Sequence, residues 1–294
     1  MRLIYTSHRV EYIPLFAQQL KNCNALALEE PETVELKKLL SKSMDIEEYV
    51  KWVDTTFPTY TFHFAKFLLK ISDKLKIYPI EPYLQIIEGI HNSVEEGKYE
   101  EYIKKPEVKK VLNVERKATA ALLEYQEAFM RKDFDMMVEN TLKFAKADAE
   151  RFVLRDKMRS KKLLSVESNT LAVEAGQIHF LLEHELSNET KVESVNLIEL
   201  ASKKIGIKYI KNPGNELTEI YIKDIIGFNE KSDLDLELLA AQALVYITIV
   251  KKEEMLPDSN EFPHLIDEVK CAKFARSLSY NKCKKFVESV WFKR

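Results

Sequence analysis

The sequence predicts an α/β protein with a mostly parallel central sheet flanked by helices, a helical insertion and a helical C-terminus. Four short apolar runs have the length of buried strands, and the segments between them have the apolar spacing of helices. Each run leads into ionisable side chains, and open α/β sheets bind ligands beyond the carboxyl ends of their strands. We therefore expect a metal or acid–base site at that edge. The four runs are residues 3–6, 25–28, 76–80 and 171–176.

The first three strands are separated by helical sequence. Residues 9–21 carry apolar side chains at helical spacing, so the first two strands and this helix form a right-handed βαβ unit. A helix over 32–41 follows the second strand. Helical sequence over 45–73, interrupted at Pro58, then leads to the third strand.

The middle of the chain contains no strand pattern. From 82 to 162 the apolar period is about 3.6, which predicts an insertion of roughly four helices with breaks near Gly97 and Pro106. The chain then divides into a first half of the α/β core (1–81), a helical insertion subdomain (82–165) and a second half with C-terminal helices (166–294). After the fourth strand we expect helices at 179 onward and 194–205, strands at 207–211 and 218–222 joined by a turn at 212–215, and helices over 233–254 and 262–292.

Composition narrows the class of protein. The 45 basic and 47 acidic side chains nearly cancel, and no basic stretch is interleaved with aromatic residues, so we expect no nucleic-acid partner.

The N-terminus lacks the pattern of a secretion signal. The longest apolar run, 238–250, is shorter than the ~18 residues that a spanning helix needs, and it predicts a buried core helix. We expect a cytoplasmic protein with no membrane partner, and the few glycines with abundant Lys, Glu and Ile resemble a thermophile composition.

Two histidines occupy matching positions after strands. His8 follows the first strand, and His179 follows Gly176 at the end of the fourth, where glycine permits a tight turn and close approach to a ligand. Neutral imidazoles together with a carboxylate suit Mn, Fe, Co or Zn. The structural alternatives are that Ser7 or Thr6 only caps the first helix, and that His179 only hydrogen-bonds a carbonyl at a helix start.

Carboxylates and an arginine complete the predicted site. Glu29 and Glu30 are adjacent and therefore point to opposite faces of the sheet, and Glu29 is the one that directly ends the apolar run. Glu81 follows the third strand, where it is either a base or a plain surface acid. Glu174 lies inside the fourth strand and is either a supporting group or exposed. Arg155, on a helix over 133–164, either stabilises an oxyanion or forms a structural ion pair.

An aromatic concentration precedes the third strand. Such spacing is typical of core packing, and the second interpretation is an apolar wall over the crevice that holds a flat or greasy ligand. Its members are Phe57, Tyr60, Phe62, Phe64 and Phe67.

The ordered motifs resemble the TraB/Tiki/ChaN/erythromycin-esterase superfamily. That superfamily has a G-x-x-H motif after the first strand, a Glu after the second, an Arg on a later helix and a second G-x-x-H. The resemblance spans about residues 1–190, and Tyr5 stands where the family's first motif usually has glycine. The matching segments are Tyr5-Thr6-Ser7-His8, Ala27-Leu28-Glu29, Arg155-Asp156 with Met158, and Val173-Glu174-Ala175-Gly176-Gln177-Ile178-His179.

The resemblance implies several activities, because the superfamily includes metal-dependent peptidases, esterases that open macrolide lactones, and haem-binding lipoproteins. Our leading hypothesis is a metal-dependent hydrolase of an amide or ester bond in a small molecule or peptide. His8, Glu29 and His179 would hold a divalent metal ion (Mn, Co, Fe or Zn), Glu81 would act as the base and Arg155 would stabilise the oxyanion. The alternatives are a non-catalytic protein that binds haem or another apolar ligand, and a homodimeric scaffold with a relic site.

Overall fold

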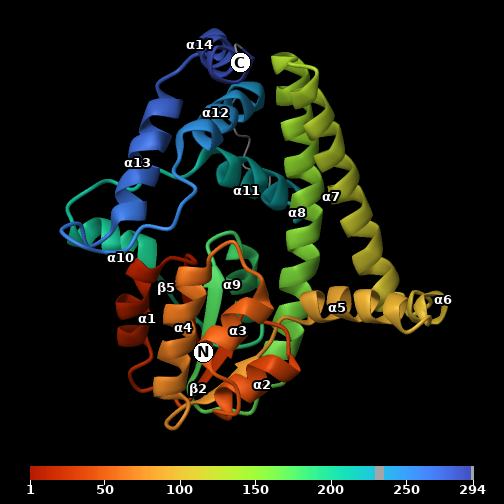
Figure 1. Cartoon of the computed structure of the whole chain (residues 1–294), viewed down its shortest axis with the longest axis vertical. Helices are drawn as coiled ribbons and strands as arrows, with labels where there is room; N and C mark the ends of the chain where they lie inside the picture. The colour runs from red at the N-terminus through yellow and green to blue at the C-terminus, as the bar shows by residue number, and fades with distance from the viewer. Residues whose placement is uncertain (229–234, 293–294) are drawn as a thin grey trace. The chain divides into compact units, whose positions relative to one another are not determined.

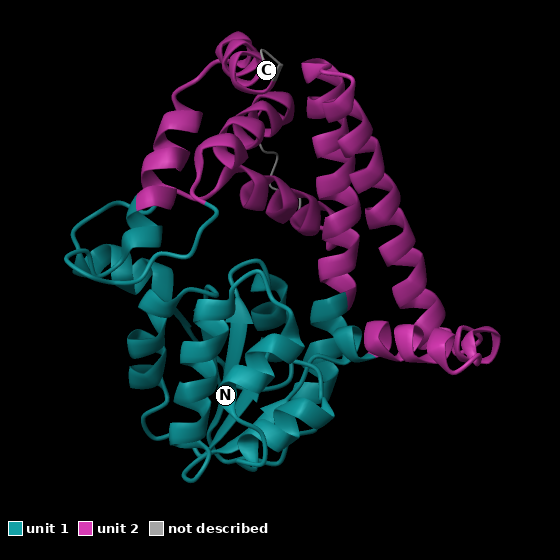
Figure 2. Ribbon diagram, in the orientation of Figure 1, with its two compact units in different colours: residues 1–85, 155–209, 252–266 teal, residues 86–154, 210–251, 267–294 magenta. Residues whose placement is uncertain are grey.

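The computed structural model describes residues 1–228 and 235–292 and divides them into two compact units (Figure 2). Unit 1 comprises residues 1–85, 155–209 and 252–266, and the described part of unit 2 comprises 86–154, 210–228, 235–251 and 267–292. The predicted start of a helix at Asp233 lies outside the described residues.

Unit 1 is built on a five-stranded sheet in the order β3-β2-β4-β1-β5, and every neighbouring pair is parallel. The four predicted strands are present, which confirms the α/β class with its parallel central sheet. Because all strands run the same way, their carboxyl ends meet at one edge (Figure 1). The strands are β1 (Arg2–Thr6), β2 (Ala25–Leu28), β3 (Lys76–Pro79), β4 (Leu171–Gly176) and β5 (Glu193–Asn196).

The two faces of the sheet are covered by different helices. Successive side chains of a strand point to opposite faces, and Leu3, Ala27 and Val173 pack with leucines of α8 and α9 in one cluster. The alternate residues face the other way, where Glu174 lies beside side chains of α2 and α4. The helices of unit 1 are α1 (Ile13–Gln19), α2 (Val34–Leu40), α3 (Ile46–Val53), α4 (Pro58–Ile71), α9 (Phe180–Ser187), α10 (Leu197–Lys204) and the last residues of α8 (Phe134–Leu164).

A late segment of the chain, 252–266, completes unit 1. The carboxylate of Glu254 accepts hydrogen bonds from the backbone N–H groups of Thr59 (2.8 Å) and Tyr60 (2.7 Å) in the first turn of α4. The buried carboxylate of Glu11 accepts in the same way from His264 (2.9 Å) and Leu265 (3.0 Å). Carboxylates are stabilised at helix N-termini, where backbone N–H groups lack helical partners. These contacts fix the segment against α4 and the start of the chain.

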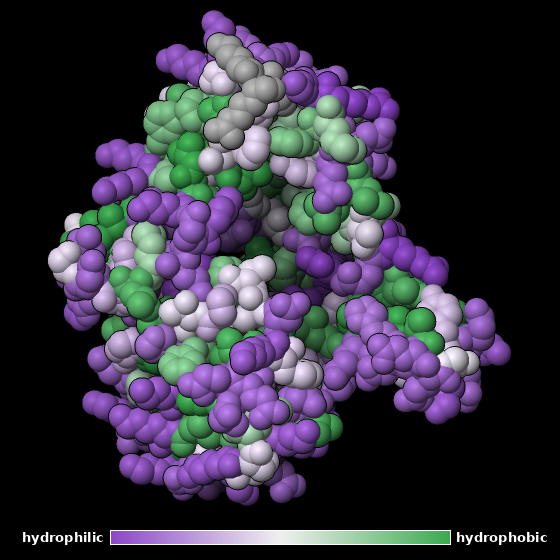
Figure 3. Space-filling model, in the orientation of Figure 1, coloured by the Kyte–Doolittle hydropathy of each residue, from purple (hydrophilic) through white to green (hydrophobic). Residues whose placement is uncertain are grey.

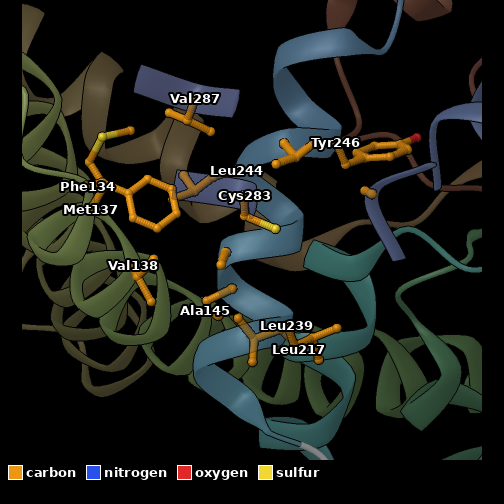
Figure 4. Packing of buried hydrophobic residues seen from close by; sticks show 14 of the residues in the cluster. Phe134, Met137, Val138, Ala145, Leu217, Leu239, Leu244, Tyr246, Cys283 and Val287 are labelled. Atoms are coloured by element: carbon orange, nitrogen blue, oxygen red, sulfur yellow. The ribbon is translucent and has the colours of Figure 1, made fainter. Parts of the chain in front are cut away.

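Unit 2 consists of helices packed around an apolar core. Figure 4 shows Phe134 and Met137 of α8, Leu244 of α12 and Cys283 and Val287 of α14 converging in this core, and all five are buried. The predicted helical insertion and helical C-terminus are confirmed. The remaining helices are α5 (Pro82–Glu95), α6 (Tyr99–Tyr102), α7 (Pro106–Met130), α11 (Pro213–Ile225), α12 (Leu236–Ile249), α13 (Pro263–Arg276) and α14 (Tyr280–Val287), followed by a π-helical turn, η2 (Glu288–Phe292).

Two predicted strands and the turn between them are wrong, and one predicted helix starts later than expected. Residues 207–211 form no strand, and the predicted strand 218–222 lies inside α11. Asn212 is not part of a hairpin turn, because its side chain caps α11 by accepting the Gly214 N–H at 2.8 Å, with Pro213 in the first turn. The predicted helix 194–205 begins later, at Leu197, because β5 occupies 193–196 at the sheet edge.

The predicted core helix in 238–250 is confirmed, since residues 239–246 of α12 are all buried. In the described part of the chain, no helix has the length and apolar character needed to cross a membrane. Hydrophilic side chains cover much of the surface visible in Figure 3.

Candidate functional site

Glu29 and Glu30 follow β2 and diverge to opposite faces of the sheet, as predicted. Glu29 enters a group of buried charges with α8 residues, on the face that α8 and α9 cover. Glu30 lines a pocket on the other face, together with residues of α2, α3 and α4. The carboxyl edge of the sheet therefore carries two separate groups of polar side chains.

His179 lies at the N-cap position of α9 and is buried. Its Nε2 lies 2.8 Å from Oε1 of Glu29, and its Nδ1 hydrogen-bonds the buried carboxylate of Asp156. Burial by itself would lower the pKa of His179, but the charges of Glu29 and Asp156 outweigh it and raise the pKa to about 9. His179 is therefore an imidazolium that donates from both ring nitrogens at neutral pH.

Glu29 is held by donors on all sides. Its Oε2 accepts the Gly176 N–H at 2.7 Å, and its Oε1 accepts from Nη2 of Arg155 at 3.2 Å. Nη1 of Arg159 lies 3.7 Å from Oε2. Burial alone would raise the pKa of Glu29, but His179 first and then the two arginines hold it well below its usual value.

Arg159 is fully buried and ties the strand ends together. Its Nε donates to the Ile80 carbonyl at 2.9 Å, and its Nη2 donates to the Glu174 carbonyl at 2.7 Å. The buried Glu81 carboxylate lies 3.4 Å from Arg155 and 3.9 Å from Arg159. We call this set the buried ion cluster: the carboxyl groups of Glu29, Glu81 and Asp156 face the cations of Arg155, Arg159 and His179.

The buried ion cluster does not fit the predicted metal site. His179 and Glu29 pair with each other and with Arg155, whereas His8 lies in the second group of polar side chains, on the other face of the sheet, so the three predicted ligands do not surround one point. Among the described residues, no group of three or more His, Cys, Asp and Glu side chains is arranged to hold one. The divalent metal ion bound by His8, Glu29 and His179 stays a prediction.

His8 belongs to the second group of polar side chains. Its ring stacks on Tyr60 of α4 at 5.3 Å between centroids, and it lines a pocket of about 150 Å³ with Glu30, Glu174 and Tyr60. We call this cavity the His8 pocket. Its other walls are formed by apolar and aromatic side chains of α2, α3 and α4, with Thr55 and Thr61: Leu36, Tyr49, Val53, Phe57, Phe64, Ala65 and Leu68.

The polar groups of the His8 pocket have shifted proton affinities. Burial raises the pKa of Glu174 to about 7, although its carboxylate accepts the Glu29 N–H at 3.3 Å and a hydrogen bond from the Tyr60 hydroxyl. The Glu30 side chain is exposed to solvent, and partial desolvation together with the neighbouring carboxylates of Glu29 and Glu81 raises its pKa. Burial raises the pKa of Tyr60 well above 10, so its hydroxyl keeps its proton.

The predicted site residues therefore separate. Glu29, Glu81, Arg155 and His179 meet in the buried ion cluster, whereas His8 lies in the pocket on the other face. Glu81 has no exposed side-chain surface, and Arg155 makes the structural ion pairs that were its alternative role. Three of the five predicted aromatic residues, Phe57, Tyr60 and Phe64, line the His8 pocket, which supports their interpretation as a wall.

Sequence reasoning missed Asp156 and Arg159 as parts of the cluster. Asp156 appeared only within the family motif, and Arg159 was not considered. A signal was available, because Arg159 stands four residues after Arg155 and therefore on the same side of α8.

Gly176 does not have the role expected from its residue type. Its φ is not positive, and a Cβ built on it would meet Glu29 Oε2 and His179 Cδ2 at 3.6 Å, which are ordinary contacts. The backbone turn after β4 therefore does not require glycine. Gly176 contributes through its N–H instead, and any residue except proline supplies that donor.

The chain is 33% identical over 295 residues to a protein of Archaeoglobus fulgidus described as an uncharacterised protein, and the match covers 100% of both chains. It belongs to the same family as this archaeal protein. No protein-family model and no solved structure matches the chain.

Proposed function

We propose that this protein is a hydrolase of an ester or amide bond, and that the reaction takes place in the His8 pocket. The observation that carries the proposal is that two carboxyl groups, an imidazole, two phenols and two threonine hydroxyls line one cavity with apolar walls at the carboxyl edge of the sheet. Apolar pockets with a few converging polar groups are the usual form of small-molecule sites. The motif resemblance to a superfamily that includes esterases and peptidases supports the same reaction class.

Glu174 is the general base in this proposal. With a pKa of about 7, it is half ionised at neutral pH, where a base accepts protons and returns them efficiently. It removes a proton from water as the water oxygen bonds to the carbonyl carbon. The same proton passes to the leaving oxygen or nitrogen when the ester or amide bond breaks. His8, a solvent-exposed residue of the pocket lining, offers its ring to the substrate for a hydrogen bond.

The buried ion cluster supports this site without entering it. The Glu29 N–H holds the Glu174 carboxylate, and Arg159 holds the Glu174 carbonyl, so the base is fixed from the opposite face of the sheet. Second-layer contacts of this kind keep catalytic groups in place. Glu81 and Arg155 serve as charges of the cluster rather than as the base and the oxyanion stabiliser.

The haem-binding alternative is not favoured by the size of the pocket. A cavity of about 150 Å³ is below the roughly 300–1,000 Å³ that drug-sized ligands occupy. Only a small substrate, or the end of a larger one, enters it.

The test is hydrolysis of a panel of short-chain nitrophenyl esters and nitroanilides. Glu174→Gln is expected to lower kcat/KM by about 10²–10⁴-fold, and His8→Gln by a smaller factor. For the wild type, kcat/KM rises with pH through about 7 as Glu174 loses its proton.

Glu32→Gln is the matched control, because Glu32 lies two residues after Glu30 and its side chain is exposed outside the pocket. It should retain wild-type kinetics. Turnover by Glu174→Gln equal to that of the wild type would contradict the assignment of the base, and a panel that the wild type fails to hydrolyse would contradict the hydrolase.

A further inference from the structure

The His8 pocket has a charge that restricts what it binds. Among its described lining residues there are two carboxyl groups, Glu30 and Glu174, and no lysine or arginine. A ligand with a carboxylate or phosphate would meet like charges there. Of the described lining residues, His8 can carry a positive charge, and its charge opposes the rise in the pKa of Glu174. A cationic ligand would add to that counter-charge and would also serve Glu30, whose side chain is exposed to solvent.

The aromatic wall suits the same kind of ligand. Tyr60 stacks on Phe64 at 5.2 Å between centroids, and Phe57 adds a third ring to the lining. The Tyr60 ring also stacks on His8, and the Arg9 guanidinium lies 4.6 Å from the Phe57 centroid. The wall therefore offers apolar surface to the alkyl part of a ligand, while the carboxyl groups hold its cation.

The cavity sets the size of the ligand. A volume of about 150 Å³ corresponds to roughly five groups of the size of a water molecule. A short alkyl chain with a terminal amine fills this space, whereas a larger group does not fit.

We propose that the His8 pocket binds a short alkylammonium group, with the ammonium held by Glu30 and Glu174 and the alkyl part against Tyr60, Phe64 and Leu68. This assignment rests on the pocket of the proposed function and names its substrate class: an ester or amide of a compound with a short aminoalkyl arm. It concerns binding, so it is tested separately from catalysis.

Binding of the ammonium group should release protons from the carboxyl groups of Glu30 and Glu174. The groups that face the pocket are His8 after β1, Glu30 after β2, Tyr49 of α3, Tyr60 of α4 and Glu174 of β4, with Glu29 and Arg159 behind Glu174 and Arg9 beside Phe57. The carboxyl groups of Glu30 and Glu174 must lose their protons to pair with the ammonium, which itself stays charged below pH 10 as lysine does. Affinity therefore increases from pH 6 to pH 8, by roughly tenfold for each carboxyl group that is linked.

The experiment uses the full-length protein and three probes of equal length: n-butylammonium, 1-butanol and butyrate. Binding is measured by titration calorimetry and by NMR shifts of pocket residues. We expect butylammonium to bind at least tenfold more tightly than either other probe at pH 8, and this preference to fall about tenfold or more in Glu30→Gln. Glu32→Gln should keep the preference in full.

Equal affinity for 1-butanol and butylammonium, or an unchanged preference in Glu30→Gln, would overturn the ligand class. Because no bond is broken, the outcome is independent of hydrolysis. If butylammonium binds but no ester or amide is hydrolysed, the ligand class is supported and the hydrolase is contradicted. If esters or amides are hydrolysed but butylammonium is not preferred, the hydrolase is supported and the ligand class is contradicted.

Discussion

The two faces of the sheet carry the same residue types in opposite arrangements. On the α8 and α9 face, three carboxyl groups are matched by three cations with side chains that are almost entirely enclosed. On the α4 face, two carboxyl groups and a histidine line the His8 pocket, and its described lining residues include no arginine. Each charge of the first group has neighbours of opposite sign, so that removing one leaves the others unpaired, whereas the carboxyl groups of the second face a cavity with space for a ligand. Changes in the two groups should therefore affect different properties.

The largest effect on stability is expected from Arg159→Met. The change removes hydrogen bonds to two carbonyl groups and leaves Glu29 and Glu81 with one cation fewer, so the free energy of unfolding of unit 1 should fall by about 3–5 kcal/mol. Urea unfolding can be followed in unit 1 alone by Trp52 fluorescence in a Trp291→Phe background, since Trp291 lies in unit 2.

Lys157→Met is the control for Arg159, because Lys157 is an exposed residue on the same helix. Its cost should stay within about 0.5 kcal/mol. Similar losses in both variants would show that α8, and not the cluster, sets the stability.

His179 should make unit 1 less stable in alkali. Its folded-state pKa of about 9 lies above the usual 6.5, so the stability it contributes is complete below pH 6.5 and is lost as the pH rises through 9. Between pH 7.5 and 9.5 the free energy of unfolding should fall by on the order of 2 kcal/mol in the wild type. The decline should be absent in His179→Gln, and a wild-type curve that is flat in this window would refute the imidazolium.

Glu174→Gln should leave the free energy of unfolding unchanged or raise it slightly, whereas changes in the buried ion cluster should lower it. The folded-state pKa of Glu174 is raised to about 7, so its contribution to stability is greatest at low pH and declines as the pH rises from about 4.5 to 7. At pH 8 the variant, which buries no charge, should be as stable as the wild type or more stable by about 1–2 kcal/mol. A loss above about 2 kcal/mol would place Glu174 with the stabilising cluster instead of the site.

The smallest effect is expected from Gly176→Ala. The added Cβ makes only ordinary contacts and the backbone keeps its N–H bond to Glu29, so the change in unfolding free energy should be below about 1 kcal/mol. Circular dichroism during urea unfolding is sufficient to measure it. A loss of several kcal/mol would mean that the strand end cannot accept a side chain.

Four of the five described strands, β1 to β4, could be predicted from the sequence, because each is a short apolar run separated from the next by helical sequence. Sequence reasoning missed β5 because this edge strand pairs only with β1 and is partly exposed, so its residues show no apolar run. Residues 218–222 were misjudged for the opposite reason, since Thr218 and Ile222 are buried in a helix that begins at the Asn212 cap.

The part of the candidate site that depends on the alternation of side chains along a strand could be predicted from the sequence. The opposite directions of Glu29 and Glu30 follow from the period of two in a strand, and the structure agrees. That His8 and His179 lie on opposite faces was not predictable from their matching positions. The direction of each depends on how the chain turns after its strand, and the two turns differ: His179 caps α9 directly, whereas β1 is followed by a short 3₁₀ turn before α1.

The bonds that Glu254 makes to the start of α4 have a consequence for how the protein is made. Tyr60 and Phe57, which form part of the pocket wall, lie beside an N-terminus whose cap is about two-thirds of the sequence away. During synthesis the wall therefore remains uncapped until the ribosome has released the 252–266 segment. A fragment that ends at residue 209 would contain every strand of the sheet but would leave the first turn of α4 without its acceptor.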